Sequence, residues 1–186
     1  MAFAVLLGAF TSCESCDREK QKKDVVETLV NIDIDYMNQN YDSFVWYESS
    51  IVLDKYLDEE SCDGSVESVT NIFQVGYGDS TISTKKVVMI THNDELILIK
   101  EVEGFWCEDV VMDTNDIEYT FNRAYERYMQ SNCVKPHSRY CVLRKPLGPC
   151  ICNAQYIFGS SNGILTFLDA VTGECSPTSP AFNCRE

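Results

Sequence analysis

The chain has 186 residues, of which 29 are Asp or Glu and 15 are Lys or Arg, so its formal net charge is −14. A surface this acidic repels phosphates and anionic headgroups, which argues against nucleic acid as a partner and against any membrane contact other than a lipid anchor. Hydrophobic residues make up 45% of the chain, enough for a packed core in one large domain or two small ones.

The N-terminus is typical of an exported protein. The apolar run AFAVLLGAF has the length of a signal-peptide core and is too short to span a bilayer, although no Lys or Arg precedes it. The letters FTSC that end at Cys13 resemble a bacterial lipobox, in which the cysteine is lipidated and becomes the first residue of the mature protein. We therefore expect a leader over 1–12, a lipid on Cys13 and a polar tether over 13–23, with a secreted protein as the alternative.

Ten cysteines are too many for an ordinary cytosolic protein and indicate disulfides in an exported one. If Cys13 carries a lipid, nine remain, so at least one is unpaired or joins two chains. The candidates for disulfide bonds are Cys62, Cys107, Cys133, Cys141, Cys150, Cys152, Cys175 and Cys184. The spacing leaves their connectivity open, with Cys62–Cys107, Cys133–Cys141, and Cys150 or Cys152 with Cys175 or Cys184 as natural pairs.

The first half, residues 24–112, begins with a helical pattern and continues with strands. The helix is predicted over 22–40, because apolar residues recur at three- and four-residue spacing. Its apolar face consists of Val25, Val26, Leu29, Val30, Ile32, Tyr36 and Met37, and its polar face of Asp24, Glu27, Asn31 and Asp35. Strands are expected within 43–57, 68–78, 85–92 and 96–106, with a turn at 93–94.

The second half, residues 113–175, repeats this order. A helix is predicted within 113–132, with Thr114 or Asp116 as its N-cap. Its apolar stripe is Ile117, Phe121, Ala124, Tyr125 and Tyr128. Strands follow at 139–145, 154–160 and 163–170, and the tail over 176–186 is irregular. The order predicts an α+β protein of two helix-plus-antiparallel-sheet halves that pack together and are stabilised by disulfides.

The closing stretch YIFGSSNGILTFLDAVTGE, together with RAYERYM in the preceding helix, resembles the end of a PepSY module over residues 114–175. This resemblance implies a small exported helix-plus-sheet unit, and a tandem of two such units if the first half is a diverged copy. Some exported tandems of this kind bind proteins through an exposed sheet face. We expect Asp169 and Thr172 to close the final turn through their side chains, and Gly173 to supply a positive φ. The same letters resemble one repeat of a quinone-binding propeller, which needs several blades where this chain has one.

Two glycine-containing segments are candidate binding loops. FQVGYG resembles the inhibitory Gln-x-Val-x-Gly loop of cystatins, and GFW could imitate their second hairpin. If this resemblance holds, a peptidase would be bound by Gly76, Tyr77, Gly78, Phe105 and Trp106. The alternative is a strand that ends in a glycine bulge.

Catalytic and metal-binding patterns are weak. The spacing Cys133-x3-His137-x3-Cys141, followed by Cys150-x-Cys152, resembles a metal site but lacks the two-residue gap of a zinc knuckle. The chain has only two histidines and no Gly-x-Ser-x-Gly elbow. We therefore expect no enzyme activity, no cofactor and no metal.

These observations favour an exported cell-envelope protein, anchored by lipid, that binds a protein or peptide partner. An inhibitor of an extracellular peptidase is the second hypothesis. A metal- or redox-active protein built on its cysteines and His137 is the third.

Overall fold

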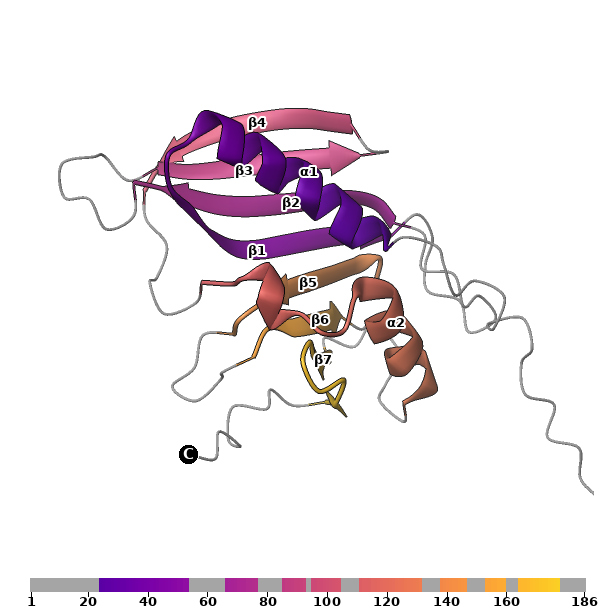
Figure 1. The fold of residues 1–186 in the computed structure, drawn as a ribbon. Helices are drawn as coiled ribbons and strands as arrows, with labels where there is room; N and C mark the ends of the chain where they lie inside the picture. The colour runs from indigo at the N-terminus through magenta and orange to yellow at the C-terminus, as the bar shows by residue number, and fades with distance from the viewer. Residues whose placement is uncertain are drawn as a thin grey trace, which may run out of the picture.

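The protein is an α+β structure in which two α-helices lie against one antiparallel sheet of eight strands (Figure 1). The computed structural model describes residues 24–53, 66–76, 85–92, 95–104, 111–131, 138–146, 153–159 and 164–177. In chain order the elements are α1 (Val25–Asn40), β1 (Phe44–Leu53), β2 (Val66–Val75), β3 (Lys85–His92), β4 (Glu95–Glu103), the 3-10 turn η3 (Thr114–Asp116), α2 (Phe121–Gln130), β5 (Tyr140–Arg144), β6 (Gln155–Gly159), β7 (Leu165–Asp169) and β8 (Cys175–Ser176).

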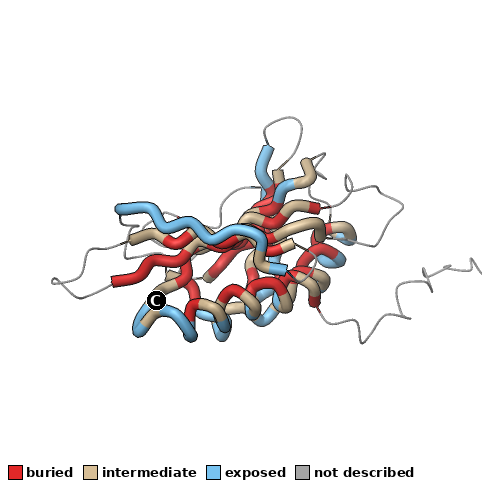
Figure 2. Tube along the Cα trace, turned by 90° about the horizontal axis from the view of Figure 1, so that it is seen from above, coloured by how far each residue is buried: buried red, intermediate tan, exposed pale blue. Residues whose placement is uncertain are grey.

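The two helix-then-strands halves join edge to edge in a single sheet of order β4-β3-β2-β1-β5-β6-β7-β8. The first strand of each half, β1 and β5, pair antiparallel at the centre, from Glu48 opposite Arg144 to Val52 opposite Tyr140. Both helices cover the same side of the sheet (Figures 1 and 2). We name this side the helix face and the opposite side the outer face.

The core lies between the helices and the helix face, because alternate strand residues point toward α1 and α2. In the first half, Ile51, Val69 and Met89 are fully buried beneath α1. In the second half, the ring of Tyr128 on α2 stacks on Phe158 of β6 with centroids 4.5 Å apart. One continuous cluster therefore holds both helices to the sheet.

Most of the predicted elements are confirmed. The first helix runs from Val25 to Asn40, and the four strands expected after it are β1 to β4. The strands expected at 139–145, 154–160 and 163–170 are β5, β6 and β7. The short strand β8 was not predicted, since two residues carry no periodicity.

The predicted start of the second helix is wrong. Thr114–Asp116 forms a separate 3-10 turn, in which the Asp113 side chain accepts from the backbone N–H of Asn115 at 2.9 Å. α2 begins only at Phe121, and the side chain of its N-cap residue, Thr120, makes no capping hydrogen bond. The apolar spacing continues through 117–121 although the backbone there is not helical, so periodicity alone misplaced the boundary.

A carboxylate from the other half caps α2 in place of Thr120. Asp24 is the N-cap residue of α1, where its Oδ1 accepts from the N–H of Glu27 at 3.0 Å. Its Oδ2 accepts from the N–H of Asn122, in the first turn of α2, at 2.8 Å. One side chain therefore satisfies N–H groups at the start of both helices, which explains why it is buried despite its predicted place on the polar face.

The closing turn after β7 has the chemistry that the sequence predicts. Asp169 Oδ1 accepts from the N–H groups of Val171 and Thr172, each at 2.9 Å, and Thr172 Oγ1 accepts from Glu174 N–H at 3.2 Å. Gly173 has φ +70°. Burial opposes ionisation of Asp169, but the hydrogen bonds to its carboxylate outweigh it and lower its pKa.

One predicted disulfide cysteine is a free thiol. Cys141 lies on the helix face of β5 opposite Ile51, where it is buried in the core. The pair Cys133–Cys141 is therefore not formed, because the β-strand register points this side chain inward. Cys175 lies half-buried in β8. The other candidates, Cys62, Cys107, Cys133, Cys150, Cys152 and Cys184, lie outside the described residues, as do Cys13 and the predicted leader and tether.

Candidate binding surface

The outer face carries a band of mainly apolar side chains that crosses both halves. None of the described helices lies on this side of the sheet (Figure 2). In order of strand pairing, the band consists of Phe167, Ile157, Val142, Ser50, Thr70, Ile90 and Leu98. Ile157 is buried, Leu98 is exposed and the others are half-buried. The two ends of the band are aliphatic or aromatic, and two hydroxyl groups lie at its centre.

The neighbouring row of the outer face is more polar. Arg144 Nη1 lies 3.5 Å from Glu48 Oε2 across the central pair of strands. Farther along β4, Lys100 is exposed, while Asp169 on β7 is held by its own turn. The row therefore sets mixed charges beside the apolar band, a composition that resembles the rim of a protein interface.

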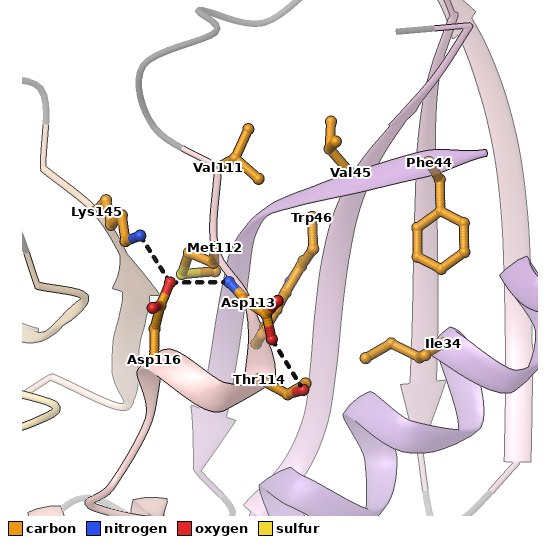
Figure 3. A pocket seen from close by; sticks show the side chains of 10 residues that line it. All are labelled: Ile34, Phe44, Val45, Trp46, Val111, Met112, Asp113, Thr114, Asp116 and Lys145. Atoms are coloured by element: carbon orange, nitrogen blue, oxygen red, sulfur yellow. Dashed lines mark hydrogen bonds and ion pairs between the residues drawn. The ribbon is translucent and has the colours of Figure 1, made fainter.

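The aromatic side chains are divided between the two faces. Phe44 and Trp46, which begin β1, pair with helix-face residues of β2, and Figure 3 shows Phe44 directed toward Ile34 of α1. On the outer face, Tyr140 is 64% exposed and Phe167 is half-buried. The outer face therefore carries mainly aliphatic side chains, and the aromatic residues at the start of β1 do not contribute to it.

The structure brings the two glycines of the predicted binding loops to the same end of the sheet. Gly76 follows β2 with φ +75°, and Gly104 follows β4 with φ +140°. The residues that precede them, Val75 and Glu103, both pair with Lys85 of the strand between. Gly76 is buried and Gly104 exposed. The other loop candidates, Tyr77, Gly78, Phe105 and Trp106, lie outside the described residues.

A hollow of about 470 Å³ opens beside this end, between α1, the start of β1 and η3 (Figure 3). Its walls include Ile34, Phe44, Trp46, Val111 and Met112. Lys145 Nζ donates to Asp116 Oδ2 at 2.7 Å in the same lining, and this bond lowers the pKa of Asp116 although burial opposes ionisation. Because the lining amine is already paired, the hollow suits an apolar group better than an anion.

A buried polar cluster beneath α1 was missed in the sequence. Asp33 accepts from Asn71 Nδ2 at 2.6 Å and from the hydroxyl of Thr91, and Ser49 donates to Asn71 Oδ1. All four residues are fully buried. Burial raises the pKa of the Asp33 carboxyl against the opposing effect of its hydrogen bonds. The sequence does indicate that Asp33 is buried, because it lies four residues from both Leu29 and Met37 on the apolar face of the helix.

The described residues contain no group of three or more His, Cys, Asp or Glu side chains suited to a metal, and the cysteine and histidine positions of the third hypothesis stay largely untested. Of the proposed metal ligands only Cys141 is described, and burial raises the pKa of that thiol, so it is a poor ligand and nucleophile. Cys133, His137, Cys150 and Cys152 lie outside the described residues. His92 is half-buried at the end of β3.

Within the described ranges, no helix has both the length and the apolarity needed to cross a bilayer. Comparison with known proteins returned no matching family model, no matching curated protein and no matching solved structure.

Proposed function

We propose that this chain is a binding protein without catalytic activity, and that a folded protein partner docks on the outer face. The observation that carries the proposal is that both helices lie on one side of the sheet, so that its apolar band has no covering helix among the described elements. Half-buried Val142, Ile90 and Phe167 supply apolar area, and the charges beside them supply a polar rim. The order of a helix followed by antiparallel strands, found in both halves, supports a PepSY-like tandem related in shape to cystatins.

The charge of the chain defines the chemistry of this partner. A net charge of −14 attracts proteins that carry an excess of Lys and Arg and repels acidic ones. The partner is accordingly a basic protein with an apolar centre to its contact surface. Its association rate falls as salt screens the attraction.

Thr70 lies at the centre of the outer face and provides a test of this surface. We expect Thr70→Arg to abolish recovery of partners that wild-type protein captures from envelope extracts, because a long cation at the centre of the band blocks close contact. Asn38→Arg, an exposed position on α1 with the same change in charge, is the matched control and should recover the same proteins as wild type. If Thr70→Arg captures the same set, the outer face is not the binding surface.

Gly76 and Gly104 lie at the same end of the sheet, and this position favours inhibition of an extracellular peptidase as a second candidate function. A peptidase bound at that end of the sheet would still be captured by Thr70→Arg. Loss of its activity on addition of that variant would distinguish end-on inhibition from docking on the outer face.

We further propose that the protein is exported and held in the cell envelope by a lipid on Cys13. The support is the lipobox-like FTSC sequence after a short apolar run. Expressed in bacteria from its own first residue, the wild-type chain is expected to incorporate labelled palmitate, and Cys13→Ser is expected to incorporate none. An unlabelled wild-type chain would contradict the anchor and leave secretion as the alternative.

A further inference from the structure

The strand β4 forms one edge of the sheet among the described strands. Within the part of the chain that the structure describes, its one strand neighbour is β3, and eight of its nine residues are exposed. Ile97 is 61% exposed, Leu98 45% and Ile99 37%. A strand with unpaired backbone groups and exposed apolar side chains is a template for pairing with another strand.

A bulge in β4 changes which of its charged residues share a face. Ile90 pairs with Leu98 and Thr91 with Leu96, so Ile97 is an extra residue in β4. Glu95 pairs with His92, and Lys100 with Val88, four residues earlier in β3 and therefore on the same face. In a regular strand, residues five apart would lie on opposite faces.

The same bulge brings two apolar residues onto the helix face. Leu96 pairs with Thr91, and Ile99 with Met89, two residues apart in β3. On either side of the bulge, β4 therefore carries Glu95 and Lys100 on the outer face. It carries Leu96 and Ile99 on the helix face. Each pair is placed symmetrically about the Ile97–Leu98 bond.

We propose that a second copy of this chain pairs antiparallel with β4 about a two-fold axis at this bond. In that register Glu95 of each copy lies opposite Lys100 of the other, and Leu96 lies opposite Ile99. Opposite-charge and apolar cross-strand pairs both stabilise antiparallel strands. The axis produces each pair twice, as an isologous interface requires.

Other symmetric registers of β4 are less favourable. An axis at Ile99 sets Lys100 opposite Leu98 and makes no pair of opposite charges. An axis at Lys100 sets two ammonium groups against each other. The bulge therefore selects one register, and it selects a copy of the same strand as the partner.

The dimer is weak and strengthened by salt. Only about six residues of each chain pair, which gives an interface below the roughly 800 Å² per partner of a standard complex. Each copy has a net charge of −14, and salt screens this long-range repulsion more than it weakens the close pairs. The dimer places the outer faces of two copies side by side in one continuous sheet. It forms along the β4 edge, where Leu98 is also the last residue of the proposed partner site, and it is tested without any partner.

Sedimentation equilibrium of the full chain over a concentration series, in low and high salt, tests the proposal. Wild type should dimerise reversibly and more tightly in high salt. Glu95→Lys and Lys100→Glu should each weaken the dimer about tenfold or more, because each sets like charges opposite each other twice. An equimolar mixture of the two variants should dimerise again, since the heterodimer restores both pairs of opposite charges.

Lys86→Glu, on the outer face of β3, makes the same change in charge as Lys100→Glu away from the edge and should dimerise like wild type. The proposal is overturned if wild type stays monomeric at every concentration and salt. It is overturned equally if Lys100→Glu behaves like Lys86→Glu, or if the mixed variants fail to associate. A dimer linked by cysteines would not respond to the exchange of charges.

Discussion

Asp33→Asn is expected to raise the free energy of unfolding at pH 7 and to remove part of its dependence on pH. The Asp33 carboxyl is fully buried, its partners among the described residues are the neutral side chains of Asn71 and Thr91, and burial raises its pKa above the ordinary 3.8. An Asn at this position keeps an oxygen for the Asn71 amide and offers an N–H to the Thr91 hydroxyl. The substitution therefore removes a buried charge and keeps the hydrogen-bond network.

The sign of the pH effect follows from this pKa. Between 3.8 and the raised value, the folded chain binds a proton at Asp33 that the unfolded chain does not, so stability falls as pH rises through this window. Above the window both states are ionised, and the cost of burying the charge is constant. The advantage of Asp33→Asn should therefore increase from acidic to neutral pH and then level off.

Urea unfolding between pH 4 and 8 measures this effect. Asp35→Asn, at an exposed position on the same helix, is the control and should change stability by less than about 0.5 kcal/mol. Asp33→Ala should lose about 3 kcal/mol, because it leaves the Asn71 amide and the Thr91 hydroxyl without their carboxylate partner. A constant difference between Asp33→Asn and wild type across the pH range would contradict the buried-charge explanation.

Asp24→Ala is expected to lower the free energy of unfolding by about 3 kcal/mol. Each helix start then loses a hydrogen bond to its N–H groups, and an N-cap substitution by Ala typically costs about 1 kcal/mol. The bonds here involve a buried carboxylate, and hydrogen bonds to charged groups are stronger than neutral ones. Loss of the link between Glu27 and Asn122 also loosens α2 from α1.

Asp24→Asn discriminates this double cap from a single one. An amide has one acceptor oxygen and cannot accept from both N–H groups in this geometry, so we expect about half the loss seen with Ala. Amide exchange of Asn122 should accelerate in both variants. Asp42→Ala, at an exposed position after α1, controls for the removal of one negative charge. If Asp24→Asn is as stable as wild type, the second cap contributes nothing.

The local elements of this fold could be predicted because their signals lie between near neighbours in the chain. The spacing of Leu29, Val30 and Met37 predicted α1, and Asp169 with Gly173 predicted the closing turn. The same periodicity also placed Asp33 on the buried face. It was overlooked because an acidic residue at such a position requires partners that only other strands provide.

The sequence did not predict the contacts between residues that are far apart in the chain. Strand alternation predicted β1 and β5 but could not show that they pair, since many registers bury the same apolar residues. Asp24 reaches Asn122 across 98 residues, and the bulge at Ile97 depends on the register against β3. The sequence by itself thus determined the helices, most of the strands and the closing turn, because side-chain direction repeats regularly along each backbone. Strand order, the shared cap and the placement of both described helices on one side of the sheet arose only when both halves packed, because they depend on which surfaces meet.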